Sequence, residues 1–212
     1  LDQHLKGTFA FPQTPQTEVA LTTTDGIPSI AITPDTSKPI LDIDVYYTQQ
    51  GQMNGQPDDR DNTMNRFWHH AAATRQGDVW TAALPVSNTE KPLWVYANVV
   101  YPLATPVTGA GYYYRSYTAT KFNLSSLVHL VSAGKLRAAG VAAMPKPSPM
   151  IETFTGTWEK EWFAYHPGEW PRTTHKVYDP QWVAPEGAKL ALEVCYEQPN
   201  KLVVGLDDYA AE

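Results

Sequence analysis

Apolar–polar alternation with a period of two residues fills the first half of the chain and constrains its fold more than any other feature. The stretches TEVALTT (17–23) and IPSIAIT (27–33) alternate in this way around the dipeptide Asp25-Gly26. An Asp-Gly pair between alternating stretches is a strong hairpin signal, because both residues tolerate the positive φ that tight hairpin turns require. The pattern therefore predicts two strands joined by a turn at 25–26.

Four more strand-like stretches follow: ILDIDVYYT (40–48), NRFWHHAAAT (65–74), GDVWTAALP (77–85) and LWVYANVVY (93–101). The second and third read as a pair around Arg75-Gln76-Gly77. The last is almost wholly apolar or aromatic, which is typical of a central strand. Six short strands within about 85 residues predict an immunoglobulin- or fibronectin-like β-sandwich over 16–102.

The strand at 40–48 should have two different faces, because successive side chains of a strand point to opposite sides. One face would carry Leu41, Ile43, Val45 and Tyr47, and the other would carry Asp42, Asp44 and Tyr46.

The middle of the chain should connect two β regions. Residues 101–122 are rich in Gly and Tyr and are expected to form a structured loop or a strand. Ser132 is a candidate N-cap for a short helix, AGKLRAA, that Gly140 would end. AMPKPSP (143–149) is the clearest linker.

A second β segment is expected from residue 151 onward. KLALEVCYE (189–197) and KLVVGLDDYAA (201–211) alternate around a Gln-Pro-Asn turn. The side chains predicted to face inward are Leu190, Leu192, Val194 and Tyr196.

Composition narrows the function. The chain has 212 residues and a formal net charge of −6, with both signs mixed along it, so no basic stripe for nucleic acid is present. No apolar run approaches the roughly 20 residues of a membrane span, and residues 1–20 lack a targeting pattern. The one cysteine, Cys195, excludes an internal disulfide and reads as a tolerated small residue rather than a nucleophile.

Catalysis by this chain alone is not expected. The sequence contains no G-x-S-x-G nucleophile elbow, no P-loop, no H-E-x-x-H motif and no paired-cysteine metal motif. The alternative that keeps an enzymatic site would place it around Asp58–Asp61 and His69. His69 and His70 should lie on opposite faces of their strand, one packed and the other exposed.

Aromatic residues are densest between 151 and 182. Flat aromatic rings stack on the C–H faces of sugars, and the same amphipathic chemistry makes Trp and Tyr common at interfaces. For any single Trp, burial in a core or an interdomain seam is the commoner outcome. The residues predicted to form stacking platforms are Trp158, Trp162, Tyr165 and Trp170.

One acidic turn offers oxygen ligands for calcium. The stretch QPDDRDN (56–62) brings together Asp58, Asp59, Asp61 and Asn62. The spacing does not match an EF-hand loop, and a solvated turn with Arg60 as its counter-ion is the favoured interpretation.

Several motifs resemble one region of known hydrolases. LDQHLKG (1–7), through Leu1, Asp2, Leu5, Lys6 and Gly7, resembles the helix that closes the α/β-hydrolase domain in dienelactone hydrolase-like and prolyl-oligopeptidase-like enzymes. Further motifs resemble the region after the hydrolase domain in large hydrolases of planctomycete-type bacteria, of the dienelactone hydrolase-related or PhoPQ-activated pathogenicity-related kind. They are DIDVYYTQQGQ (42–52), DDRDNTMNRFWHHA (58–71), PLWVYANVVYPL (92–103), GAGYYYRSYT (109–118), KFNLSS (121–126), ETFTGTWEKEWFAY (152–165) and APEGAKLALEV (184–194).

The end of the chain resembles the start of carbohydrate-binding jelly rolls, which open with a Phe-containing strand, a Gly and a Trp. Such jelly rolls often hold a structural calcium, for which Glu152 and Asp207 are the candidates. No other cofactor is expected.

The resemblance implies that the catalytic triad lies upstream of the closing helix and outside this sequence. The chain would comprise a helix remnant and linker (1–15), the sandwich (16–102), a connecting segment with a short helix (103–147) and a galactose-binding-like jelly roll, complete or truncated (148–212). Leu1, Leu5, Phe9 and Phe11 would dock on the upstream hydrolase domain.

The expected function is a non-catalytic accessory module that positions a hydrolase on a polysaccharide or cell-surface glycan, with a periplasmic or secreted location favoured. Two other classes stay open. One is a purely structural interdomain module, and the other is an esterase-like fragment with its own activity.

Overall fold

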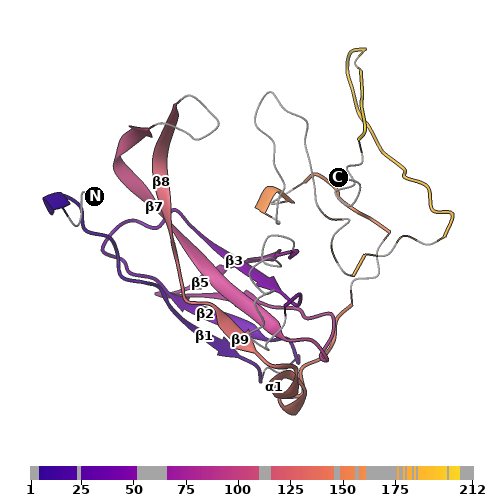
Figure 1. Cartoon of the computed structure of the whole chain (residues 1–212), viewed down its shortest axis with the longest axis horizontal. Coiled ribbons are helices and arrows are strands. Elements are labelled where there is room, and N and C mark those ends of the chain that lie inside the picture. Colours follow the sequence, from indigo (N-terminus) through magenta and orange to yellow (C-terminus); the bar gives the residue numbers. More distant parts are fainter. Residues whose placement is uncertain are drawn as a thin grey trace.

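The computed structural model is a β-sandwich of two antiparallel sheets with one short helix (Figure 1). It describes residues 5–22, 25–51, 66–109, 116–145, 149–155, 158–160, 176, 179, 181–182, 184, 186–199 and 201–205. The all-β fold class is the one that the strand pattern predicts.

The first sheet has the strand order β1 (Gln16–Ala20), β2 (Ser29–Thr33), β6 (Val79–Ala83) and β5 (Thr74–Gln76). The second sheet has the order β4 (His69–Ala72), β3 (Asp42–Thr48), β7 (Leu93–Gly109) and β8 (Tyr117–Ser125), and β9 (His129–Val131) also pairs with β7. The strand at 93–101 is thus central, as its apolar sequence predicts.

The predicted hairpin around Asp25-Gly26 is confirmed. Strands β1 and β2 are antiparallel, and the last pair before the turn is Ala20 with Ser29. Gly26 has a φ of 73°, in the region that glycine adopts at little cost. A Cβ atom at this position would lie 3.1 Å from the Cβ of Ala142, a tight contact that adds to the preference for glycine.

Strand β3 shows the predicted alternation. Ile43, Val45 and Tyr47 are buried between the sheets, and Asp42, Asp44 and Tyr46 lie on the opposite face. Leu41, which precedes the first residue of the strand, is exposed, so the prediction that it shares the buried face is wrong.

The stretch at 65–74 was expected to form one strand and instead contributes to both sheets. β4 pairs with β3 in the second sheet, and β5 pairs with β6 in the first. The chain passes between the sheets at Ala73, the residue between the two strands. A hairpin is present in this region, but its turn lies at Gly77-Asp78, with a φ of 66° at Gly77, and Arg75 and Gln76 belong to β5 rather than to the turn.

Strand β7 is longer than the sequence pattern predicts. It continues to Gly109 and pairs with β8, with a register shift between Pro102 and Val107. The outer parts of these two strands form a ribbon that leaves the sandwich (Figure 1). The Gly- and Tyr-rich region is therefore largely strand where it is described.

The predicted short helix is present as α1 (Ala133–Ala138), which lies at one end of the sandwich (Figure 1). The Ser132 hydroxyl accepts a hydrogen bond from the Lys135 backbone N–H, and Gly140 follows the helix with a φ of 70°. Leu136 is fully buried in the core. Burial of such a side chain contributes about 1.5–3 kcal/mol, which anchors this short helix to the sheets.

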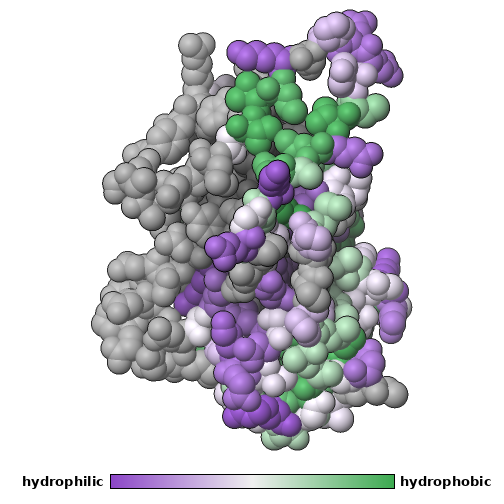
Figure 2. Space-filling model, turned by 90° about the vertical axis from the view of Figure 1, so that its right-hand side faces the viewer, coloured by the Kyte–Doolittle hydropathy of each residue, from purple (hydrophilic) through white to green (hydrophobic). Residues whose placement is uncertain are grey.

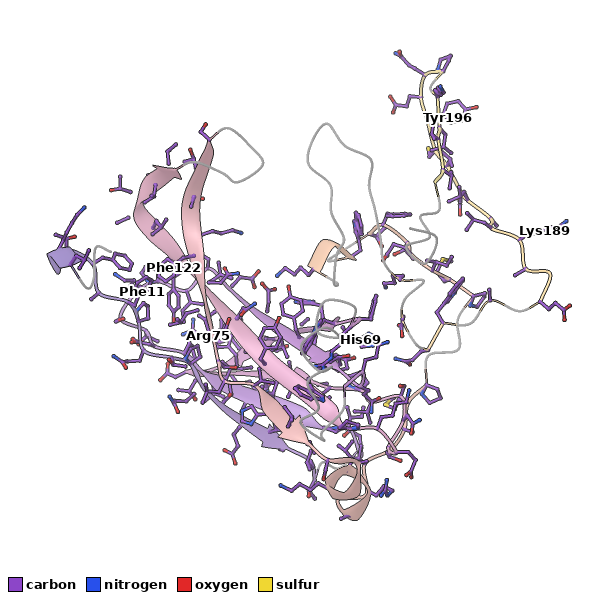
Figure 3. The ribbon with its side chains drawn as sticks, viewed as in Figure 1. Phe11, His69, Arg75, Phe122, Lys189 and Tyr196 are labelled. Atoms are coloured by element: carbon purple, nitrogen blue, oxygen red, sulfur yellow. The ribbon has the colours of Figure 1, made fainter. Side chains whose placement is uncertain are left out.

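The N-terminal stretch packs within the chain. Phe9 and Phe11 contact Phe122 of β8 edge-on, at centroid distances of 5.8 Å and 5.5 Å (Figure 3 shows Phe11 and Phe122). Phe11 nevertheless remains 49% exposed, so its docking on an upstream domain stays a prediction. Leu5 is exposed, and Leu1 lies outside the described residues.

The described part of 148–212 contains one 3-10 turn, η4 (Trp158–Lys160), and no strand. Leu190 and Tyr196 are 63% and 70% exposed, so the prediction that 190–196 faces inward is wrong. An alternating stretch can bury one face only when further strands or a helix cover it. Much of this segment lies outside the described residues, so the jelly roll itself stays a prediction.

Apolar side chains of the two alternating stretches gather at the upper end of the face in Figure 2. They are Leu190, Leu192, Val194, Leu202, Val203 and Val204. Among the described residues, no helix has the length and apolar character needed to cross a membrane.

Candidate functional site

The outward face of the second sheet carries the main cluster of polar and aromatic side chains in the described part of the chain. Tyr46 pairs with His70 on one side and with Tyr96 on the other, which makes one rung across β4, β3 and β7. On the next rung Asp44 pairs with Asn98, and Asn98 pairs with Ser125. We name this the polar–aromatic face, formed by Asp44, Tyr46, Trp68, His70, Tyr96, Asn98 and Ser125.

The rings of the first rung make a partly exposed aromatic strip. Tyr46 and Tyr96 are stacked, with centroids 5.7 Å apart and an interplanar angle of 28°. Trp68 meets Tyr96 edge-on at 5.2 Å, and His70 meets Tyr46 at 5.5 Å. Tyr46, Trp68 and Tyr96 all keep part of their surface open.

The second rung supplies hydrogen-bonding groups. The Ser125 hydroxyl donates to Asn98 Oδ1 over 2.6 Å. The Asn98 side-chain amide nitrogen makes no hydrogen bond to the rest of the described chain. It is therefore placed to donate to a ligand hydroxyl beside the aromatic strip.

Asp44 is the electrostatic centre of the face. Its Oδ1 lies 3.1 Å from His70 Nε2 and 2.7 Å from Lys160 Nζ. Burial by itself raises the pKa of Asp44, but hydrogen bonds from His70 and Lys160, with the Lys160 charge, outweigh burial and hold that pKa below its ordinary value. The carboxylate is therefore charged at neutral pH.

The same charge acts on Tyr96. Burial, and then the negative charge of Asp44, raise the pKa of Tyr96. The phenol therefore stays neutral and can donate a hydrogen bond.

Lys160 brings the η4 turn onto this face. Its Nζ atom bridges Asp42 Oδ2 at 2.5 Å and Asp44 Oδ1 at 2.7 Å. Burial lowers the pKa of Lys160, but hydrogen bonds to the two carboxylates outweigh burial and raise that pKa overall. The C-terminal half of the chain, to which η4 belongs, makes a second contact with the sandwich: Asp179 Oδ1 lies 3.9 Å from His69 Nε2.

Of the four aromatic residues predicted to stack on sugars, the structure describes only Trp158, and that residue is buried. Trp158 is 5% exposed and contacts Phe154 edge-on at 5.1 Å. Its ring is therefore packed, as expected of most tryptophans, and the prediction of an open stacking platform is wrong for Trp158. Trp162, Tyr165 and Trp170 lie outside the described residues.

Both carboxylate oxygens of Glu152, a candidate metal ligand, contact other groups of the protein. Its Oε1 accepts backbone hydrogen bonds from Thr153 and Phe154. Its Oε2 lies 3.4 Å from Lys176 Nζ, an ion-pair distance without hydrogen-bond alignment. The Lys176 ammonium thus supplies the positive charge that a metal ion would otherwise bring to this carboxylate.

No group of three or more His, Cys, Asp or Glu side chains gathers for a metal among the described residues. Asp207, and the calcium candidates Asp58, Asp59, Asp61 and Asn62, lie outside them.

His69 and His70 do lie on opposite faces of β4. His69 packs among Tyr47 and Phe67, with centroids 5.1 Å and 4.9 Å away. The expectation that one ring is exposed is wrong, because the two side chains keep only 7% and 6% of their surface. Cys195 is exposed.

Sequence reasoning missed Tyr96 and Asn98. The signal was present, since even-numbered positions of β7 alternate with buried Val95, Ala97 and Val99 and must face outward. Attention to the almost wholly apolar or aromatic character of 93–101 concealed it.

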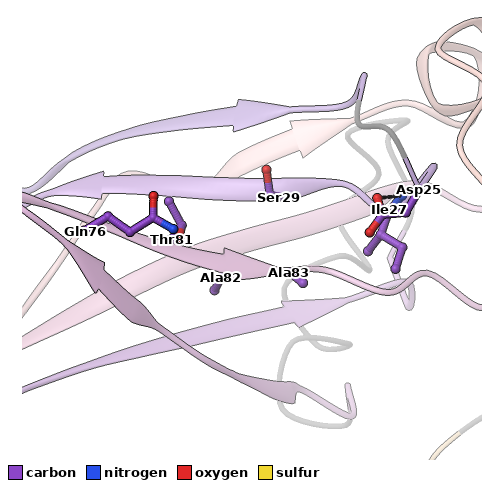
Figure 4. A pocket seen from close by; sticks show the side chains of 7 residues that line it. All are labelled: Asp25, Ile27, Ser29, Gln76, Thr81, Ala82 and Ala83. Atoms are coloured by element: carbon purple, nitrogen blue, oxygen red, sulfur yellow. Dashed lines mark hydrogen bonds between the residues drawn. The ribbon is translucent and has the colours of Figure 1, made fainter.

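A shallow groove of about 460 Å³ lies on the first sheet (Figure 4). Small side chains from neighbouring strands, Ser29 and Ala83, leave it open, and Asp25 is the one charged residue among the described residues that line it. Asp25 Oδ1 already accepts a hydrogen bond from the Ile27 N–H over 3.1 Å. No pair of ionisable groups from the described residues faces this groove, so these residues do not form an acid–base site there.

Comparison with known proteins finds no family model, no curated protein and no solved structure that matches the chain.

Proposed function

We propose that the chain is a non-catalytic accessory module of a multidomain α/β-hydrolase and that it binds a carbohydrate through the polar–aromatic face. The observation that carries this proposal is the pair of neighbouring rungs, one aromatic and one hydrogen-bonding, on a single sheet face. Sugars present C–H faces beside hydroxyl groups, so such a surface complements them.

The spacing of the rungs suits one sugar ring. Side chains two residues apart on one strand face are about 7 Å apart along the strand. A pyranose that lies on Tyr96 can therefore bring a hydroxyl to Asn98 on the next rung. The phenol of Tyr46 extends the flat surface toward the neighbouring strand.

Affinity electrophoresis against a panel of soluble polysaccharides tests the proposal. Tyr96→Ala should reduce retardation by the ligand polysaccharide more than tenfold, since truncation of a central aromatic at a binding surface commonly costs more than 2 kcal/mol. Phe11→Ala is the matched control, because Phe11 is also a partly exposed aromatic but lies at the N-terminal stretch. Equal retardation of both variants and the wild type would contradict carbohydrate binding at this face.

The contact made by Lys160 favours a second candidate, a domain-packing module. In that case the polar–aromatic face serves mainly to seat the C-terminal half of the chain, through Asp42 and Asp44. Mutation of Tyr96 would then alter protease sensitivity of residues beyond 149 and leave every polysaccharide unbound.

A further inference from the structure

A second hollow lies elsewhere on the sandwich and has a different chemistry. It has a volume of about 370 Å³, within the range of roughly 300–1,000 Å³ typical of small-ligand sites. Its walls come from the connection between β2 and β3 (Thr36, Ser37, Lys38) and from the strand pair β5–β6 (Arg75, Trp80). The polar–aromatic face belongs to the other sheet.

Two cations line this hollow without a carboxylate partner in the described part of the chain. Arg75 donates through Nε to the Gly77 carbonyl over 2.8 Å, which fixes the guanidinium and leaves its terminal nitrogens available. The Lys38 ammonium lies 4.6 Å from the centroid of the Phe9 ring. The nearby carboxylate of Asp35 is held by the backbone N–H groups of Gln13 and Ser37 and by the Ser37 hydroxyl, whose oxygen can still accept a hydrogen bond from a ligand.

Trp80 supplies a flat apolar wall. It is the cross-strand partner of Arg75, so both side chains lie on the same side of the β5–β6 pair. The indole packs against the core on one side and remains partly exposed. An aromatic plane thus adjoins a guanidinium, an ammonium and the hydroxyl groups of Thr36 and Ser37.

We infer that this hollow is a binding site for a glycuronic acid unit, a sugar ring that carries a carboxylate. The ring would lie on Trp80, the carboxylate would meet Arg75 and Lys38, and the ring hydroxyls would meet Thr36 and Ser37. Arginine binds carboxylates through two parallel hydrogen bonds, which gives this group direction as well as charge. The inference does not rest on the polar–aromatic face, so an experiment can disprove one of the two binding sites and leave the other standing.

The test is a calorimetric titration of the full chain with trigalacturonate, which measures the dissociation constant. The comparison ligands are cellotriose, which is neutral, and a short Glu-containing peptide, which is acidic but not a sugar. The site variants are Arg75→Gln and Lys38→Gln. Lys135→Gln, on the exposed side of α1, removes the same charge elsewhere.

Trigalacturonate should bind the wild type, and each site variant should bind it roughly three- to tenfold more weakly. Lys135→Gln should bind it as the wild type does. Equal affinity for cellotriose, or an unchanged affinity in Arg75→Gln and Lys38→Gln, would overturn the site. Equal affinity for the peptide would overturn the sugar assignment, and loss of binding in Tyr96→Ala would move the ligand to the other sheet.

Discussion

Lys160 Nζ lies 2.7 Å from Asp44 Oδ1 and joins a turn of the C-terminal half to the polar–aromatic face of the sandwich. Asp44 also accepts a hydrogen bond from His70, so one carboxylate serves both the face and the turn. Asp42 and Asp44 together hold a single ammonium. This contact makes the sandwich and the η4 turn energetically coupled.

Lys160→Met should loosen the η4 turn and leave the sandwich folded. The side chain is 31% exposed, and ion pairs with this much solvent contribute about 0–1 kcal/mol, too little to unfold two sheets. Hydrogen exchange should become faster at residues 158–160 and stay unchanged in β3 and β7. Lys135→Met serves as the control, and faster exchange throughout β3 would contradict the local character of the contact.

Stability should fall at acid pH through Asp44. Its pKa is lower in the folded chain than in the unfolded one, so the charged form stabilises the fold above the unfolded pKa of about 3.9. That contribution is lost as the pH falls through the folded pKa. Thermal unfolding should therefore show a smaller drop below pH 4 for Asp44→Asn than for the wild type.

Asp78→Asn, in the exposed turn between β5 and β6, is the control for that comparison. It removes a carboxyl group outside the polar–aromatic face and should retain the wild-type acid profile. The same profile in Asp44→Asn would show that the hydrogen bonds to Asp44 do not stabilise the fold.

Gln49 should be a main determinant of stability outside the apolar core. Its buried amide accepts the N–H groups of Ser87 and Asn88 through Oε1, at 2.7 Å and 3.1 Å. Gln49→Leu leaves these two donors without an acceptor, which should cost about 2–6 kcal/mol at roughly 1–3 kcal/mol for each unsatisfied group. Urea unfolding measures the loss, and exposed Gln76→Leu should be close to neutral.

Tyr101→Phe should have a smaller effect. The Tyr101 ring is fully buried, and its hydroxyl donates to the Asp35 carbonyl over 2.9 Å. Removal of the hydroxyl keeps the packing and loses one hydrogen bond, at a cost of about 0.5–1.5 kcal/mol. A neutral result in urea unfolding would indicate that water replaces the phenol at that carbonyl.

The sequence predicts the sandwich because most of its signals are local. The turn at Asp25-Gly26, the alternation along Ile43, Val45 and Tyr47 and the N-cap at Ser132 each depend on neighbours within a few residues. The crossing at Ala73 could not be predicted in this way, because nothing in the run Ala71-Ala72-Ala73 marks a break between two strands. Which sheet each half joins is decided by partner strands distant in the sequence.

The candidate site was harder to predict for a similar reason. Asp44 and Tyr46 were placed on one face from alternation, but their neighbours Tyr96, Asn98 and Lys160 depend on strand register and on a contact 116 to 118 positions along the chain. The aromatic density at 151–182 drew attention to Trp158, which is packed. Composition alone does not separate an exposed ring from a buried one.

The most direct test of the central claim is a two-dimensional amide NMR titration of the full chain with the polysaccharide fragment that binds best in the electrophoresis panel. Carbohydrate binding at the polar–aromatic face predicts saturable shifts at Tyr46, Tyr96 and Asn98, with no shift at Ser29 or Ala83 on the opposite sheet. Tyr96→Ala should abolish these shifts. Saturable shifts that leave Tyr46, Tyr96 and Asn98 unmoved would contradict the account.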